Sequence, residues 1–384
     1  MNILITVGIF PPDIGGPASF VPKISNFLIE NGHNVKIVCL AEVENNHTED
    51  NLDVIRIKRS NSLPIRWIKT IYQIIKHGKK SDLIFVNGLG IESTIANLLL
   101  KKQLIRKIVG DPVWERAYNQ KKTAESFDEF QNNKHSFLIE LQKLLRNWSI
   151  NSAEIVITPS DHLKSFVSGL GFSSKILKIN NGVDITDIKK SNLHKADVNL
   201  LIISRLVIQK NINLVIEAME LLDNKNLKLS IIGEGGEFSK LEAVIHDLNL
   251  QNRVQLLGKI DNNRIPQFLL TADIFIQASD YEGLPHSVLE AINYEVPILS
   301  TEVGGCKNLL NDGERGFIIP IPPDKKIIAE NIIFIINNKD EATKRADAAK
   351  AFISNKHNFL VQANQYMEIF QQNEKIELLK KRKY

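Results

Sequence analysis

Two carboxylates, Glu282 and Glu290, lie eight positions apart in this sequence. An apolar run at residues 273–278 precedes them and is typical of a buried strand. We expect a helix over residues 285–293, because a proline at its start lacks only an N–H that the first turn leaves unpaired. Glu290 then lies on the second turn, and Glu282 lies in the loop before the helix. The pattern predicts two acidic side chains that bind hydroxyl groups beside one helix start.

The residues between these carboxylates suit a phosphate. Gly283 and Leu284 occupy the loop just before the expected helix, and we expect their backbone N–H groups to point the same way as those of the first turn. A helix start with such N–H groups favours negatively charged ligands. The alternative is a solvated helix start with surface carboxylates.

Two cations follow another expected strand. Arg205 and Lys210 lie in the loop after the apolar run 200–203. Arginine offers a planar fork for phosphate oxygens, and lysine offers a compact charge. Isolated cations in loops are usually only solvated, but a position at the end of a strand favours a binding role for this pair.

Glycines mark two further strand ends. Gly15 and Gly16 follow the first expected strand, and Gly233 and Gly235 follow the strand at 229–232. Without a Cβ atom, glycine lets the backbone approach a ligand closely, although a plain turn explains each pair as well. The first pair is not a dinucleotide fingerprint, because Gly-x-Gly-x-x-Gly is absent there.

The context of the two carboxylates is more specific than their spacing. They stand in Glu-Gly-Leu-Pro-x-x-x-Leu-Glu-Ala, preceded by Ser279 and Tyr281 and followed by Gly304-Gly305. This pattern resembles the nucleotide-sugar site of retaining glycosyltransferases of the GT4 type, the glycosyl transferases group 1. The resemblance covers nearly the whole chain, tightly in residues 198–320 and loosely before residue 190.

The resemblance implies a role for each matched residue. Arg205 and Lys210 would stabilise the leaving diphosphate, Glu282 would lie near the sugar ring, and Glu290 would accept hydrogen bonds from the ribose. The implied donor-binding set is Gly15, Gly16, Gly233, Gly235, Lys259, Ile260, Gly283, Leu284 and Glu290. Ser204 and Asn211 depart from the family, which usually has glycines there.

Asp111 stands where many members of the family have a histidine that faces the reacting carbon. The resemblance implies that Asp111 orients the donor sugar or receives the proton of the acceptor, which places it with Arg205, Lys210 and Glu282 as a catalytic candidate. An Asp-Pro turn is an equally good explanation of the same residue. We expect Trp114 and Glu115 to shape the acceptor pocket.

The elements that position these residues alternate between strands and helices. Expected strands lie at 3–7, 35–40, 54–57, 83–86, 105–109, 155–158, 176–179, 200–203, 229–232, 254–256, 274–276, 298–300 and 317–319, and expected helices at 18–30, 64–76, 137–151, 214–222, 238–248, 263–270, 285–293 and 358–372. Such alternation predicts an α/β fold with parallel sheets.

The resemblance makes this the GT-B class, two facing Rossmann-like domains with parallel sheets and an interdomain cleft. We expect an acceptor-side domain at residues 1–190 and a nucleotide-sugar domain at 191–357, joined near 189–197. The C-terminal helix at 358–384 is expected to pack back on the first domain.

Composition limits the class of protein. The 384 residues are 43% hydrophobic and 24% charged, as in ordinary globular proteins, and no apolar run approaches the ~18 residues of a membrane span. Only Cys39 and Cys306 are present, so no disulfide framework or zinc cluster is predicted. A cytoplasmic location is expected, and no metal or other cofactor.

The charge is uneven. Residues 1–190 hold 25 Lys/Arg against 19 Asp/Glu, a net +6, while the whole chain carries +4. Pairs such as Arg106-Lys107 are most simply solvated helix faces. Residues 64–80 have two explanations of equal weight. One is reversible, peripheral contact with the inner face of the membrane. The other is a helix whose apolar stripe only packs on the sheet.

The expected function is transfer of a sugar from a UDP- or GDP-sugar to the hydroxyl of a sugar or lipid-linked acceptor, in cell-surface polysaccharide or glycolipid synthesis. Two alternatives stay open. One is a nucleotide-sugar 2-epimerase of the same fold, and the other is a non-catalytic nucleotide-sugar-binding subunit. No nucleic-acid partner is expected.

Overall fold

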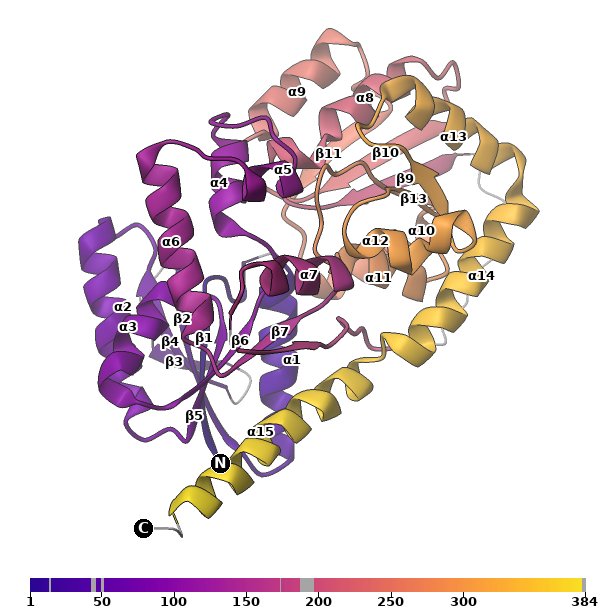
Figure 1. Cartoon of the computed structure of the whole chain (residues 1–384). Helices are drawn as coiled ribbons and strands as arrows, with labels where there is room; N and C mark the ends of the chain where they lie inside the picture. Colours follow the sequence, from indigo (N-terminus) through magenta and orange to yellow (C-terminus); the bar gives the residue numbers. More distant parts are fainter. Residues whose placement is uncertain (14, 43–45, 50–51, 173, 187–196, 382–384) are drawn as a thin grey trace. The chain divides into compact units, whose positions relative to one another are not determined.

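The computed structural model describes residues 1–384 except 14, 43–45, 50–51, 173, 187–196 and 382–384 (Figure 1). The chain forms two compact units. Unit 1 comprises Met1–Val113, Lys134–Asn180 and Leu360–Tyr384, and unit 2 comprises Trp114–Asn133 and Asn181–Phe359. The expected joint at 189–197 lies almost wholly outside the described residues.

Unit 1 is built on a sheet with the strand order β3-β4-β2-β1-β5-β6-β7-β8. All neighbouring strands are parallel except the edge strand β3, which runs antiparallel to β4. The strands are β1 (Asn2–Val7), β2 (Asn34–Ala41), β3 (Asn46–Glu49), β4 (Leu52–Lys58), β5 (Leu83–Asn87), β6 (Gln103–Lys107), β7 (Ile155–Thr158) and β8 (Lys175–Lys178). The helices are α1 (Gly16–Glu30), α2 (Leu63–Gly78), α3 (Gly90–Leu100), α6 (Phe137–Asn151), α7 (Asp161–Gly169) and most of α15 (Phe359–Lys381).

Alternation along the strands separates the two faces of this sheet. Ile84 and Val86 of β5 belong to the core cluster that includes Ile74 of α2. Phe85, between them, points the other way and lies 5.5 Å from the ring centroids of both Tyr366 and Phe370 of α15. The aromatic side chains of α15 thus complete the second face of unit 1.

Lys107, the last residue of β6, is buried on that second face. Its Nζ lies 3.6 Å from the ring centroid of Phe20. Burial lowers the pKa of Lys107 to about 7. The interpretation of Arg106-Lys107 as part of a solvated helix is therefore wrong, because both residues belong to a central strand whose side chains face packed helices.

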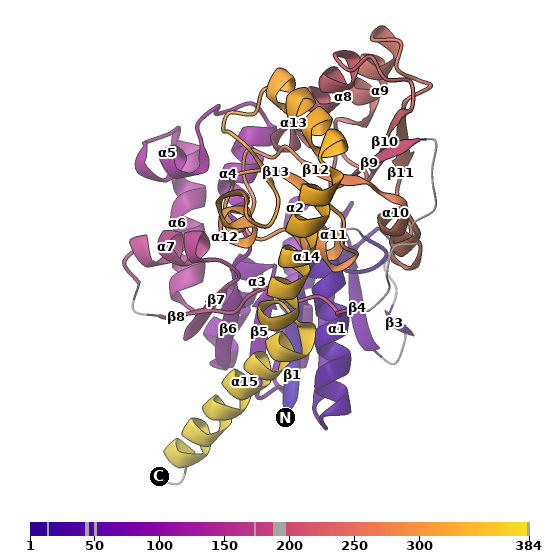
Figure 2. The same cartoon turned by 90° about the vertical axis from the view of Figure 1, so that its right-hand side faces the viewer.

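Unit 2 contains a six-stranded parallel sheet with the order β11-β10-β9-β12-β13-β14. Its strands are β9 (Val198–Ile203), β10 (Leu227–Ile232), β11 (Val254–Gly258), β12 (Ile274–Gln277), β13 (Ile298–Thr301) and β14 (Phe317–Ile319). Its helices are most of α4 (Pro112–Asn119), α5 (Phe127–Asn132), α8 (Ile212–Glu220), α9 (Phe238–Asp247), α10 (Ile265–Thr271), α11 (His286–Asn293), α12 (Gly305–Leu310), α13 (Lys325–Asn337) and α14 (Lys339–Lys356). In both cartoon views α8 lies between α9 and α13 (Figures 1 and 2).

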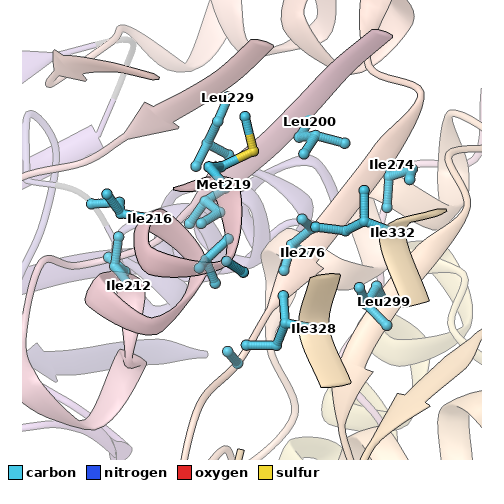
Figure 3. Close-up of a cluster of buried hydrophobic side chains, with 14 of the residues drawn as sticks. Leu200, Ile212, Ile216, Met219, Leu229, Ile274, Ile276, Leu299, Ile328 and Ile332 are labelled. Carbon is cyan, nitrogen blue, oxygen red and sulfur yellow. The ribbon is translucent and has the colours of Figure 1, made fainter. Parts of the chain in front are cut away.

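The core of unit 2 also follows the two-residue period of its strands. Leu200 and Ile276 point towards α8 and α13, where Ile216 and Ile332 meet them in one cluster (Figure 3). Leu201 belongs instead to the cluster on the opposite face, under α10, α11 and α14. Both faces of the sheet are covered, as expected for a buried parallel sheet.

The expected fold class is confirmed, since the structure has two α/β units with parallel, Rossmann-like sheets. The division of the chain is more complex than one cut near residue 190, because Trp114–Asn133 belongs to unit 2. Helix α11 begins at His286, so Pro285 is its N-cap and not its first helical residue. Among the described residues, no helix is long and apolar enough to cross a membrane.

Candidate active site

The structure brings Lys210 and Glu282 together at the carboxyl ends of β9 and β12. Lys210 Nζ donates a hydrogen bond to Glu282 Oε1, and Ser279 Oγ donates to the same oxygen at 2.8 Å. The two charged side chains are only 9% and 13% exposed. Parallel sheets bind ligands beyond the carboxyl ends of their strands, so this ion pair lies where a ligand of unit 2 is expected.

Asn211 joins the same two loops. Its Nδ2 donates to Asp280 Oδ1 at 2.6 Å and to Ala278 O at 3.0 Å, and Asp280 N donates to Gln209 O at 2.9 Å. Asn211 has φ +49°, in the left-handed region that glycine and asparagine tolerate best. This conformation explains why asparagine can stand where the family usually has glycine.

Arg205 follows β9 on the same edge of the sheet. Its side chain is 48% exposed, and Nη2 lies 3.3 Å from Glu115 Oε2 of α4. A half-exposed guanidinium with one carboxylate partner retains donors for an anion such as a diphosphate. The structure therefore places Arg205 and Lys210 at the same edge of the unit 2 sheet, but in different ion pairs, with Glu115 and Glu282 respectively.

The start of α11 lies directly after Glu282. In the part of the chain that the structure describes, neither Gly283 N–H nor Leu284 N–H donates a hydrogen bond. Asn181 Nδ2 donates to Leu284 O at 2.9 Å and so fixes this loop from the carbonyl side. N–H groups of this kind before a helix start are the type of group that binds anions.

Glu290 lies on the second turn of α11, as expected, and is partly exposed. Burial and the charge of Glu290 raise the pKa of Tyr294. Lys259 and Ile260 follow β11, where Lys259 is exposed and Ile260 packs against the core cluster under α10. Lys259 and Ile260 thus lie in the loop after a strand of unit 2, whereas Glu290 lies within α11.

Several glycines have a packing role that the sequence did not reveal. A Cβ atom on Gly233 would lie 1.8 Å from Ser204 O, and one on Gly235 would lie 2.2 Å from Leu206 O. On Gly304, which has φ +48°, it would lie 1.6 Å from Glu282 O. The loop after β10 therefore touches the loop after β9 backbone to backbone, and the loop after β13, through Gly304, touches the Glu282 loop after β12 in the same way.

Cys306 lies beneath this loop and is fully buried. Gln277 Nε2 donates to its Sγ at 3.4 Å. Burial, with the nearby charge of Glu282, raises the pKa of Cys306 to about 12. The thiol is therefore protonated at neutral pH and is not a nucleophile.

The remaining expected residues lie in unit 1. Gly15 has φ +148° and precedes α1, which begins at Gly16. Asp111 is fully buried, and its two carboxylate oxygens have different partners: Oδ1 accepts the N–H of Val113 at 3.0 Å, and Oδ2 accepts from Arg146 Nη1. Asp111 thus holds the start of α4, as the Asp-Pro turn explanation requires.

The structure also identifies residues that the sequence did not. Tyr118 OH donates to Asp280 Oδ2 at 2.6 Å, and Asn119 Nδ2 lies 3.4 Å from Gln209 Oε1. Both come from α4, which was not predicted as a helix. Aromatic side chains four positions apart, Trp114 and Tyr118, were the available signal, since this spacing places them on one helix face. Among the described residues, no group of three or more His, Cys, Asp or Glu side chains could hold a metal ion.

Comparison with solved structures supports the fold. The sucrose-phosphate synthase from Thermosynechococcus elongatus is 18% identical, with a TM-score of 0.81 over 98% of this chain and 99% of that chain. Anabaena Alr3699/HepE in complex with UDP and glucose is 19% identical, with a TM-score of 0.79 over 97% of this chain and 100% of that chain. At such identities the likeness shows the fold alone.

Sequence comparison gives the family. Residues 184–373 match the glycosyl transferases group 1, and residues 14–187 match glycosyltransferase family 4. A phosphatidylinositol N-acetylglucosaminyltransferase subunit from Arabidopsis thaliana is 30% identical over 173 residues, which are 44% of this chain and 38% of that protein. The chain spans 30–42% of the length of this and two other curated relatives. The two matches together extend from residue 14 to residue 373, and the chain belongs to the GT4-type glycosyltransferases of the GT-B fold.

Proposed function

We propose that this chain transfers a sugar, with retention of anomeric configuration, from a UDP- or GDP-sugar to the hydroxyl of a sugar or lipid-linked acceptor. The observation that carries the proposal is the Lys210–Glu282 pair beside the start of α11, with Arg205 on the same sheet edge. Cations and oriented N–H groups around one position suit a diphosphate that gains charge as it leaves.

The proposed reaction breaks the bond between the anomeric carbon and the diphosphate oxygen and forms a bond from that carbon to the acceptor oxygen on the same face. Arg205 and Lys210 bind the departing diphosphate, while Gly283 and Leu284 donate their N–H groups to it. Glu282 lies beside the sugar ring, and Glu290 accepts hydrogen bonds from the ribose.

The acceptor hydroxyl loses its proton in this reaction, and Asp111 remains our candidate for receiving it or for orienting the donor sugar. Its carboxylate oxygens already accept from Val113 N–H and Arg146, and each oxygen keeps a further lone pair for a proton or a hydroxyl. Replacement of Asp111 by Asn tests this role, because the amide can still accept the Val113 N–H but cannot take a proton.

The proposed donor set also includes the glycine loops of both units. Gly233, Gly235, Lys259 and Ile260 lie after strands β10 and β11. Gly15 and Gly16 lie before α1 in unit 1. Support for a UDP-sugar comes from the Anabaena structure, which holds UDP and glucose, and support for a lipid-linked acceptor comes from the name of the Arabidopsis relative.

The screening experiment needs no acceptor. Purified protein is incubated with UDP-, GDP- and ADP-sugars, and slow release of the nucleoside diphosphate is measured, with and without a chelator. The proposal expects release from one of these donors, unchanged by the chelator because we propose a metal-free transfer. Release that disappears in the Arg205→Ala protein identifies the site, whereas equal release by that variant would count against the assignment.

Peripheral contact with an anionic membrane belongs to this proposal, and α2 is its candidate surface. Ile65, Ile68 and Tyr72 of α2 are 51%, 68% and 59% exposed. The helix carries Arg66, Lys69 and Lys76 and no acidic residue. Exposed apolar side chains with cations favour an anionic lipid surface, and each cation contributes about 1 kcal/mol.

Sedimentation with vesicles tests the membrane contact. The wild-type protein should sediment with phosphatidylserine vesicles at low salt and be released at high salt, and Ile68→Ser should weaken the binding. The matched control is Ile333→Ser on α13 of unit 2, which is 47% exposed and lies outside α2. Wild-type protein that stays in the supernatant at low salt would contradict the proposal and favour a soluble acceptor.

A further inference from the structure

Residues Trp114–Asn133, here called the α4–α5 segment, come from the first half of the chain but belong to unit 2. The family match that covers them, residues 14–187, otherwise corresponds mainly to unit 1. Their polar contacts reach both loops of the proposed donor site. Glu115 contacts Arg205 after β9, and Tyr118 contacts Asp280 after β12.

Aromatic rings attach the same segment to the residue next to Glu282. The rings of Phe127 and Tyr281 stack with centroids 4.3 Å apart and planes 8° from parallel. Trp114, which is fully buried, lies edge-on to Tyr281 at 5.1 Å and donates its Nε1–H to Glu125 O at 3.0 Å. Asp280 and Tyr281, the two residues before Glu282, are therefore both held by the α4–α5 segment.

We propose that the α4–α5 segment holds the Glu282 loop in its productive position and that Tyr118 is a positioning residue of the transfer reaction. The expected effect on kcat/KM rests on the proposed function. Without the Tyr118 hydroxyl, Asp280 Oδ2 loses this hydrogen bond, while Oδ1 keeps its bond from Asn211. The backbone at 280–282 then gains freedom, and the Glu282 carboxylate meets Lys210 for a smaller fraction of the time.

The chemistry of Tyr118 suits this role. Its burial and the Asp280 carboxylate raise the pKa of its hydroxyl, so the group stays a hydrogen-bond donor across the neutral range. A neutral donor to a charged acceptor makes one of the stronger hydrogen bonds in proteins. Its ring lies 4.9 Å from Trp114, a contact that phenylalanine would preserve.

The test replaces Tyr118 by Phe, which removes one oxygen and keeps the ring. We expect kcat/KM for donor hydrolysis to fall about tenfold, as for loss of a hydrogen bond to a charged group. In an Asp280→Ala background the same replacement should have no further effect. Ser354→Ala is the matched control, because it removes a hydroxyl that donates to Lys350 O within α14 of unit 2, and it should leave kcat/KM unchanged.

Amide hydrogen exchange supplies a readout that does not depend on turnover. Exchange should become faster in peptides covering residues 278–290 of the Tyr118→Phe protein and stay unchanged in β1 and β5 of unit 1. Unchanged exchange at 278–290, or faster exchange with unchanged kcat/KM, would overturn the positioning role. If the wild-type protein hydrolyses no donor, the proposed function fails, and faster exchange together with weaker UDP or GDP binding would still support the α4–α5 contact.

Discussion

Replacing Lys210 by Met should affect stability and turnover together, because Lys210 is the cation of a nearly buried pair. Its Nζ donates to Glu282 Oε1, and the side chains are 9% and 13% exposed. Among the described residues, the variant leaves the Glu282 carboxylate with the hydrogen bond from the Ser279 hydroxyl. Breaking a buried pair from one side typically costs about 3 kcal/mol or more.

That cost translates into a measurable melting temperature. Unit 2 comprises Trp114–Asn133 and Asn181–Phe359, a unit of about 200 residues, for which 1 kcal/mol shifts Tm by about 2–4 °C. Lys210→Met should therefore lower the Tm of unit 2 by roughly 6–12 °C. Donor hydrolysis should fall about 10²–10³-fold, the usual effect of removing a group that stabilises developing charge.

Two further variants separate stability from chemistry. The double replacement Lys210→Met with Glu282→Gln removes both charges. Most of the decrease in Tm caused by Lys210→Met should therefore be recovered, while donor hydrolysis stays low. Arg205→Ala, at a side chain that is 48% exposed, should lower hydrolysis strongly and change Tm by less than about 2 °C. Calorimetry and release of nucleoside diphosphate are the assays. A wild-type Tm in Lys210→Met, or restored hydrolysis in the double variant, would refute the reasoning.

Three other substitutions test separate parts of the account. Glu115→Gln should tighten binding of UDP or GDP about two- to fivefold, because it frees Arg205 from a half-exposed ion pair worth up to about 1 kcal/mol. Titration calorimetry measures the affinity, and weaker binding would contradict this role of Arg205. Glu290→Gln should mainly weaken donor binding with little change in the maximal rate, and unchanged affinity would mean that Glu290 faces elsewhere. Lys107→Met should raise Tm at pH 7. The folded pKa of Lys107, about 7, lies below the unfolded value, so the wild-type protein gains stability as pH rises from 7 towards about 10.5. Thermal unfolding across that range should show a smaller gain in Lys107→Met, and an equal gain in both proteins would contradict the burial argument.

The sheets and the Glu282 region could be predicted from sequence because their signals are local. Apolar runs ending in glycine or in charged loops located the ends of β9, β10 and β12 within a few residues. The strand-to-helix turn around Glu282 was equally accessible, although Pro285 caps α11 and does not begin it. Local periodicity and turn chemistry determine features of this kind.

Contacts between distant parts of the chain could not be predicted. Tyr118 and Asp280 are separated by 162 positions, so no local pattern relates them. The sequence order places the α4–α5 segment in the first domain, whereas in the structure it belongs to unit 2. The basic pair Arg106-Lys107 predicts a solvated cluster. However, β6 is a central strand of the sheet, and the Phe20 ring covers the Lys107 side chain. The packing reasons for Gly233, Gly235 and Gly304 likewise arise only when separate loops meet.

The most direct test of the central claim is the anomeric configuration of the product. Once donor screening has identified a UDP- or GDP-sugar, the reaction with a simple acceptor alcohol or sugar is followed by proton NMR from its first minutes. We expect a glycoside with the same configuration as the donor, formed by wild-type protein and lost in Lys210→Met and Arg205→Ala. An inverted product, or transfer that persists in both variants, would contradict it.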